Sequence, residues 1–285
     1  MKDSLILRFL YKTILGRLLL KLLVQPKVSQ IAGNILSSRK SKCLVPYYIR
    51  KHKINMANIE IPKGGFLSFN DFFTRKRKME CMDITDGYLI SPCDSWLLPV
   101  RVGKDTIFEV KHAQYSLSDI LKDTGLASMF EDGMALIFRL TPANYHRYCY
   151  VANGKILLSR KIQGELHCVR PIALRTVPVY IQNSREYQVI KTDKFGTMVH
   201  MEIGALLVGK IKNHKKSIEK KYIQAGEEKG YFEFGGSTII LLFQKDAICM
   251  NGNLYKKNKN HAEIRVRMGE FIAQINQERR GYNEQ

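Results

Sequence analysis

The sequence lacks the features that define several common protein classes. No uncharged apolar run approaches the roughly 18 residues of a membrane-spanning helix, because Arg8, Lys12 and Arg17 interrupt the only early apolar stretch. The same charges argue against a secretory signal. The six cysteines include no C-x-x-C pair and no zinc-ligand spacing. We therefore expect free thiols in a reducing compartment and no metal site.

Acidic residues are almost absent from the first 58 residues, which hold twelve Lys or Arg and a single acid, Asp3. The whole chain carries a formal net charge of +20. Such a basic end suggests a polyanionic partner, either an anionic membrane or a nucleic acid, and ordinary solubilising charge is the alternative. We favour a membrane because a Leu-rich stretch, residues 4–24, adjoins a basic cluster made of Arg39, Lys40, Lys42, Arg50, Lys51 and Lys53.

Residues 4–24 are helical by composition. As one straight helix they would carry basic side chains on two opposite sides and would show no single apolar stripe. Either the helix breaks near Gly16, or the basic side chains extend out of a helix that lies in a bilayer interface. A core or dimer helix is the alternative.

The pattern changes to β-type from about residue 87. A helix is expected at 29–41, a linker at 55–65, a short helix after Ser68 or Asn70 as its cap, and another helix at 117–126. Short apolar or alternating runs separated by turn residues predict strands at 88–90, 96–102, 107–110, 135–140, 156–158, 177–180, 187–191, 198–203, 239–243 and 263–268. Together the expected helices and strands predict an α+β fold, in which a β-rich domain (residues 61–285) carries a helical, basic N-terminal region (residues 1–60).

Three polar positions stand out in the β region. Asp94 follows a bend set by Pro92, and His146 lies in a segment (144–150) dense with titratable groups. Ser237 follows two glycines between two apolar runs, where a β-bulge or tight turn is one interpretation. The other is that its hydroxyl attacks the preceding glycine carbonyl. An acid, a base and a hydroxyl in separate segments match the logic of an activated nucleophile.

The chain resembles the phosphatidylserine decarboxylase proenzymes through an ordered set of motifs from about residue 8 to residue 270. These are Arg8-Phe9-Leu10-Tyr11, Gly16-Arg17-Leu18-Leu19, Phe69-Asn70-Asp71-Phe72-Phe73-Thr74-Arg75, Ser91-Pro92-Cys93-Asp94, Tyr145-His146-Arg147, Asn183-Ser184-Arg185-Glu186, Val208-Gly209-Lys210-Ile211 and Gly235-Gly236-Ser237-Thr238.

The resemblance implies self-cleavage between Gly236 and Ser237, giving a β chain (1–236) and an α chain (237–285). Ser237 would become a pyruvoyl group, which forms a Schiff base with the substrate amine and accepts the electrons left when CO₂ departs. Asp94 would orient and charge the site of His146, the motif histidine. The implied product is phosphatidylethanolamine.

The motif departs from the usual family pattern in two places. Cys149 stands where many members have a second histidine, and Ser95 where the Asp is usually followed by Gly. Either His146 serves both cleavage and decarboxylation, or Cys149 takes one proton-transfer step. A small apolar filler is the other interpretation of Cys149, and His167 is a candidate substitute imidazole. Contacts with a substrate phosphate or carboxylate are expected from three arginines, namely Arg75, Arg147 and Arg185.

The resemblance also implies a partner and a location. The expected partner is phosphatidylserine in an anionic membrane, met peripherally at the cytoplasmic face of the cell membrane, without nucleic acid. The two chains of the precursor would stay together, and a homodimer is left open. Two alternatives remain. One is a pyruvoyl-dependent decarboxylase of a soluble amino acid, and the other is an uncleaved, membrane-binding member of the family.

Overall fold

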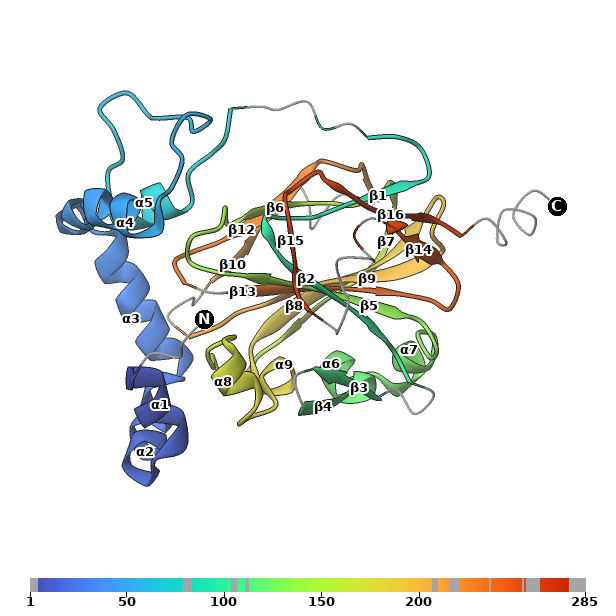
Figure 1. The fold of residues 1–285 in the computed structure, drawn as a ribbon, viewed down its shortest axis with the longest axis horizontal. Coiled ribbons are helices and arrows are strands. Elements are labelled where there is room, and N and C mark those ends of the chain that lie inside the picture. The colour runs from blue at the N-terminus through green and yellow to red at the C-terminus, as the bar shows by residue number, and fades with distance from the viewer. Residues whose placement is uncertain are drawn as a thin grey trace.

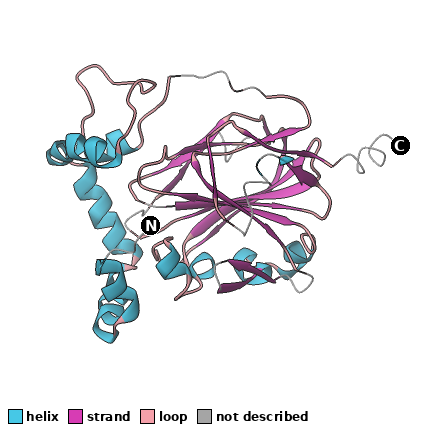
Figure 2. Ribbon diagram, viewed as in Figure 1, coloured by secondary structure: helices cyan, strands magenta, loops and turns pink. Residues whose placement is uncertain are grey.

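The computed structural model describes residues 5–78, 82, 84–103, 107–110, 113–206, 210–215, 221–235, 237–252, 254 and 262–276. The helical elements (Figures 1 and 2) are α1 (Leu5–Lys12), α2 (Ile14–Leu23), α3 (Pro26–Ser37), the 3₁₀ helix η1 (Arg39–Cys43), α4 (Leu44–His52), α5 (Phe69–Phe73), α6 (Leu117–Leu121), α7 (Thr124–Ser128), α8 (Pro171–Leu174) and α9 (Val179–Gln182).

An eight-stranded antiparallel sheet dominates the fold, in the order β11-β7-β8-β9-β13-β5-β2-β15. Smaller sheets have the orders β1-β16-β14, β10-β12-β6 and β3-β4. The strands are β1 (Tyr88–Ile90), β2 (Ser95–Arg101), β3 (Ile107–Val110), β4 (Ala113–Ser116), β5 (Met134–Leu140), β6 (Arg147–Cys149), β7 (Gly154–Ile162), β8 (Arg185–Thr192), β9 (Thr197–Ile203), β10 (Ile211–Asn213), β11 (Tyr222–Ile223), β12 (Glu228–Phe232), β13 (Ser237–Phe243), β14 (Ile248–Met250), β15 (Ile264–Val266) and β16 (Phe271–Ile275).

This mixture of helices with a large sheet confirms the predicted α+β class. Helices α6 to α9 lie along one side of the eight-stranded sheet, and the sheet β10-β12-β6 lies on the other (Figure 1). Helices α1 to α4 extend as an arm beside the sheets. Strand β13 is buried on both faces, as its continuous apolar run predicts.

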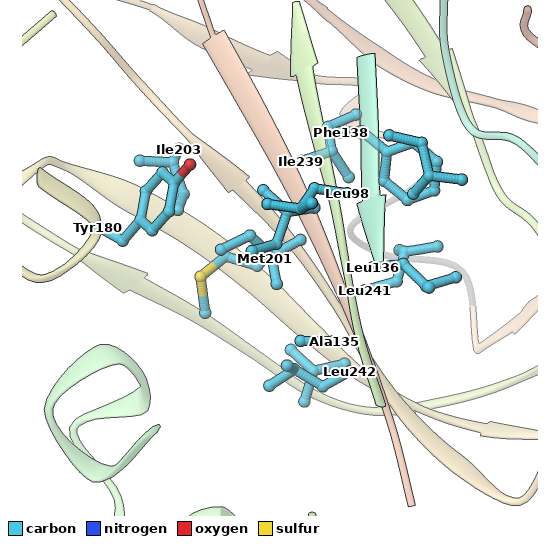
Figure 3. Packing of buried hydrophobic residues seen from close by; sticks show 14 of the residues in the cluster. Leu98, Ala135, Leu136, Phe138, Tyr180, Met201, Ile203, Ile239, Leu241 and Leu242 are labelled. Atoms are coloured by element: carbon cyan, nitrogen blue, oxygen red, sulfur yellow. The ribbon is translucent and has the colours of Figure 1, made fainter. Parts of the chain in front are cut away.

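Both faces of β13 pack into the main core. Ile239 and Leu241 lie beside Phe138 and Leu136 of β5, while Leu242 pairs with Ala135 and points to the other face (Figure 3). Every described residue of this strand is buried. The strand that begins at Ser237 is therefore held firmly from both sides.

The N-terminal helix breaks, as one of the two interpretations predicted, although the break lies at Thr13. The Thr13 hydroxyl accepts a hydrogen bond from the Gly16 amide and so caps α2. A Cβ on Gly16 would lie 2.0 Å from the Phe9 carbonyl oxygen, so only glycine permits this close approach of α1 and α2. Within the described residues, no helix combines the length and apolarity that crossing a membrane requires.

Two other elements differ from the sequence prediction. The strand expected at 177–180 is wrong, because Val179–Gln182 forms helix α9, in which the amides of Ile181 and Gln182 bond the Pro178 carbonyl. The helix expected at 117–126 is divided into α6 and α7 by Lys122, whose φ of 52° is left-handed. The chain beyond residue 276 lies outside the described residues.

A second hydrophobic cluster connects the N-terminal arm with the sheets. The linker region 55–65 contains no helix or strand, and Ser68 caps α5 by accepting from the Asp71 amide. Phe234 packs against this cluster and so attaches the segment before Ser237 to it. The cluster consists of Val45, Tyr48, Ile59, Phe66, Phe69, Phe72 and Phe73, and so includes the three phenylalanines of α5.

Candidate active site

Ser237 occupies the first position of β13, in the middle of the eight-stranded sheet. It pairs with Leu140 of β5, is fully buried, and its Oγ has no hydrogen-bond partner among the described residues. Gly235 has φ 131°, a conformation that favours glycine. Gly236 lies outside the described residues. The structure thus presents an unbonded, buried hydroxyl just after a glycine-dependent bend.

His146 lies between β5 and β6, fully buried. Its Nε2 is 3.1 Å from the Thr141 carbonyl oxygen. Because a carbonyl only accepts, Nε2 carries the proton and Nδ1 carries the lone pair. Nδ1 is buried and has no hydrogen-bond partner in the part of the chain that the structure describes. Burial, and secondarily the Arg75 cation, lowers the His146 pKa to about 3. The imidazole is therefore neutral at pH 7 and has one nitrogen available to accept a proton.

The segment before Ser237 is connected to His146 by a backbone hydrogen bond and, through Phe73, by ring packing. The Phe232 amide donates to the His146 carbonyl at 2.9 Å. Phe73 of α5 lies against the imidazole with ring centroids 4.2 Å apart, and Phe234 packs edge-on against Phe73 at 5.1 Å. Farther along, Ser237 pairs with Leu140, one residue before the Thr141 that bonds His146. The fold thus brings the predicted serine and the predicted histidine into one region.

Asp94 lies directly before β2 and has a different partner from the one predicted. It forms an ion pair with Arg77, with one hydrogen bond of 3.1 Å, and accepts from the Met268 amide at 3.0 Å. Over the part of the chain that is described, no hydrogen bond joins Asp94 to His146. Asp94 and His146 are linked electrostatically through Arg75. The Asp94 carboxylate raises the pKa of Arg75, and the Arg75 cation lowers the pKa of His146.

Cys149 lies on β6 and is almost fully buried. Its Sγ contacts the carbonyl oxygens of Pro92 at 3.6 Å and Ser91 at 3.9 Å, in the turn before Asp94. Burial raises the pKa of this thiol to about 12. The thiol is therefore protonated at neutral pH, which is the behaviour of a small packing residue and a poor proton acceptor.

His167, the candidate substitute imidazole, already has two partners. Its Nε2 is 2.8 Å from a Glu165 carboxylate oxygen, and its Nδ1 is 3.4 Å from the Tyr11 hydroxyl of α1. The Tyr11 hydroxyl also accepts from the Cys168 amide. These contacts connect the N-terminal arm with the β domain.

The three predicted anion-binding arginines lie in different environments. Arg147 pairs with Glu228 at 2.6 Å and lies over the Tyr231 ring. Arg185 donates to four backbone carbonyls. Arg75 lines a cavity of about 310 Å³, together with Asp94 and the loop before His146. Of the three, Arg75 has the position best suited to a ligand.

Several residues near the site were not singled out from the sequence. Arg77 pairs with Asp94, and the Asn70 side chain accepts from the Phe234 amide at 3.2 Å. A buried pair, Lys229 and Glu202, lies on the sheet face that Ser237 shares, because Glu202 is opposite Ile239 in the register. Asn70 stood inside a quoted motif, but nothing in the sequence marked Arg77 or the buried pair.

Comparison with known proteins agrees with these features. A sequence model described as phosphatidylserine decarboxylase matches residues 69–274. The chain is 41% identical over 274 residues to phosphatidylserine decarboxylase proenzyme 2 of Clostridium acetobutylicum, covering 95% of this chain and 92% of that one. It is 37% identical over 273 residues to the phosphatidylserine decarboxylase proenzyme of Ruminiclostridium cellulolyticum, covering 94% and 90%. For the Fusobacterium nucleatum phosphatidylserine decarboxylase proenzyme, identity is 35% over 269 residues, covering 93% and 89%. The chain belongs to the phosphatidylserine decarboxylase family of carboxy-lyases.

Proposed function

We propose that this chain is a proenzyme that cuts itself between Gly236 and Ser237 and then decarboxylates phosphatidylserine to phosphatidylethanolamine. One observation carries the proposal. Ser237 is fully buried at the start of β13 with an unbonded hydroxyl, directly after a glycine pair, in a chain whose relatives are named proenzymes. A buried hydroxyl without a hydrogen bond lowers the stability of the folded chain. Its presence here therefore supports a chemical role for Ser237.

The proposed cleavage uses the chain's own groups. The Ser237 oxygen attacks the Gly236 carbonyl carbon, so the peptide C–N bond breaks as an ester forms. A base then removes the Cα proton of residue 237 as the Cβ–Oγ bond breaks, and this elimination frees residues 1–236 with a carboxylate end and leaves dehydroalanine at 237. Hydrolysis of this residue releases ammonia and leaves a pyruvoyl group. His146 Nδ1, which carries a lone pair, is the proposed acceptor of the hydroxyl proton.

The surroundings of residue 237 suit a pyruvoyl group. Once formed, its carbonyl would supply an electron sink for the electrons left by CO₂. The buried position keeps the group away from bulk solvent. His146, held in one tautomer by Thr141, is the proposed group that moves protons in both steps. Cys149 is assigned a packing role because its thiol stays protonated.

The two proposed chains remain paired after the cut. Strand β13, which belongs to residues 237–285, lies between β5 and β9, which belong to residues 1–236. Arg139 of β5 also forms a bidentate ion pair with Glu263, at 2.7 and 2.9 Å. Full ladder pairing on both sides supports a tight complex of α and β chains.

The N-terminal arm supports action at a membrane surface. Helices α1 and α2 expose large apolar side chains, including Leu5 at 81% and Ile14 at 79%. The interspersed basic residues would meet anionic headgroups. We propose peripheral binding at the cytoplasmic face. The exposed apolar residues of α1 and α2 are Leu5, Ile6, Phe9, Ile14, Leu15, Leu18, Leu19 and Leu22.

Release of CO₂ from phosphatidylserine vesicles tests the substrate. We expect release by the wild-type chain and none by Ser237→Ala. Release from free serine without release from vesicles would instead favour a soluble amine substrate. An uncut, inactive wild-type chain that still binds vesicles would favour the membrane-binding alternative.

A further inference from the structure

A strongly basic cavity of about 310 Å³ lies beside the candidate active site. Its volume is at the lower end of the roughly 300–1,000 Å³ of small-molecule sites. The loop that precedes His146 forms one wall, through Asn144 and Tyr145. Five permanent cations line it against one carboxylate, Asp94, and these cations are Lys53, Arg75, Arg77, Arg265 and Arg267.

Arg75 is the most buried of these cations, and among the described residues it forms no ion pair with a carboxylate. The residue is 5% exposed, and its guanidinium reaches the Phe72 and Phe73 carbonyls only at 3.4 Å. Its Nε is buried and meets no acceptor within the described ranges. Burial, and next the Arg77 cation, lowers the Arg75 pKa to about 10. A buried cation of this kind gains stability from a bound anion.

The single carboxylate of the cavity is already engaged. Asp94 accepts two hydrogen bonds from Arg77 and one from the Met268 amide. Its single charge is directly paired with Arg77, so the five cations that line the cavity outnumber the one carboxylate that lines it. The cavity has the charge and the donors for an anion from outside the chain.

Arg265 and Arg267 supply the exposed side of the cavity. In and after β15 they alternate with the buried Ile264 and Val266, so both arginines point to the same face. Both line the same cavity as Arg75. Guanidinium groups bind phosphate oxygens through paired, charge-assisted hydrogen bonds.

We propose that this cavity binds a phosphate group, held by Arg75, Arg265 and Arg267. Under the proposed function, on which this assignment of ligand rests, the phosphate is the phosphodiester of the substrate headgroup. Arg75 belongs to residues 1–236, and the other two belong to residues 237–285. The site is therefore assembled from both products of the proposed cut, and the headgroup is bound only where the two chains are together.

Two probes test the site on the full chain by calorimetry at fixed ionic strength. One is dihexanoyl-phosphatidylserine below its micelle concentration, and the other is inorganic phosphate. We expect Arg265→Gln and Arg267→Gln each to weaken binding of the lipid probe about tenfold, the effect of one lost charge-assisted hydrogen bond. Arg101→Gln, an exposed arginine outside the cavity, is the matched control.

The outcomes separate the sources of the phosphate and separate this proposal from the proposed function. Loss of lipid binding with no effect of inorganic phosphate as competitor supports the headgroup. Loss of inorganic phosphate binding alone supports a free phosphate and overturns the headgroup assignment. Equal binding of both probes by Arg265→Gln, Arg267→Gln and Arg101→Gln overturns the site. Repeating the titrations with Ser237→Ala removes any dependence on cleavage or turnover. The phosphate site can therefore be refuted while the proposed decarboxylation holds, and the proposed decarboxylation can be refuted while the phosphate site holds.

Discussion

Asp94 forms a bidentate ion pair with Arg77, and the Arg77 guanidinium lies over the Tyr145 ring, 4.3 Å from its centroid. The Met268 amide completes the contacts of Asp94. These contacts join the turn before β2, the loop before His146 and the segment after β15. Asp94 therefore acts on the site by neutralising a cation and by fixing three segments together.

Asp94→Asn should impair both cleavage and stability. Loss of the carboxylate leaves the charges of Arg77 and Arg75 without this counter-charge, and the Arg75 cation disfavours proton acceptance by the imidazole. The ion pair is partly exposed, so we expect a loss of roughly 1–3 kcal/mol in the free energy of unfolding. Urea titration and the uncut fraction on gels measure these effects. Asp86→Asn, an exposed acid paired with Lys194, is the control. Equal behaviour of the two variants would refute this role.

His146 should make the folded chain sensitive to acid. The imidazole titrates near pH 6.5 when unfolded and near pH 3 when folded. Between these values the unfolded state binds a proton that the folded state does not. The free energy of unfolding should then fall with falling pH, by about 1.4 kcal/mol per pH unit from this group. In a Ser237→Ala background, His146→Gln should show a shallower decline between pH 6.5 and pH 4 in urea titrations. Parallel declines would contradict the assignment.

Cys149→Ala should leave self-cleavage unchanged within about twofold, because a thiol with a pKa near 12 is protonated at neutral pH. The small cavity should cost about 1 kcal/mol of stability. The cleaved fraction after cell-free synthesis measures the rate. Cys249→Ala, at an exposed cysteine, is the control. A Cys149→Ala chain that stays uncut while Cys249→Ala is processed would assign the thiol a step in cleavage.

Paired charges on α2 should weaken membrane binding. Leu18 and Leu22 are exposed on one helical face, and burying each in a bilayer interface contributes about 1.5–3 kcal/mol. Leu18→Glu combined with Leu22→Glu should lower the partition onto anionic vesicles at least about tenfold. Sedimentation with vesicles measures this. Leu157→Glu, an equally exposed leucine on β7, should partition like wild type. Retained binding by the double variant would exclude α2 as the contact.

Local sequence patterns predicted many of the strands, but they failed where contacts between distant segments determine the structure. The run 239–243 was identified because a strand buried on both faces is continuously apolar. The apolar residues 177–180 suggested a strand as well, but the Pro178 carbonyl starts a helical turn there. The position of β13 between β5 and β9 could not be predicted, because it depends on pairing between segments far apart in the sequence.

In the candidate site, too, the sequence predicted some residues but not the contacts that depend on the fold. Ser237 and His146 were singled out from the sequence, and the fold brings their segments together. The partner of Asp94 was not predicted, because Arg77 is 17 residues away in the sequence and meets Asp94 only in the folded chain. The protonation of Cys149 also depends on burial, which the residue type alone does not specify.

Intact-mass analysis of the purified chain tests the central claim, self-cleavage at Ser237, most directly. We predict that the wild-type protein separates under denaturing conditions into residues 1–236 and residues 237–285, the latter beginning with a pyruvoyl group. Ser237→Ala should remain one chain close to the 32.9 kDa of the full sequence. A wild-type protein that also remains a single chain of that mass would contradict the account.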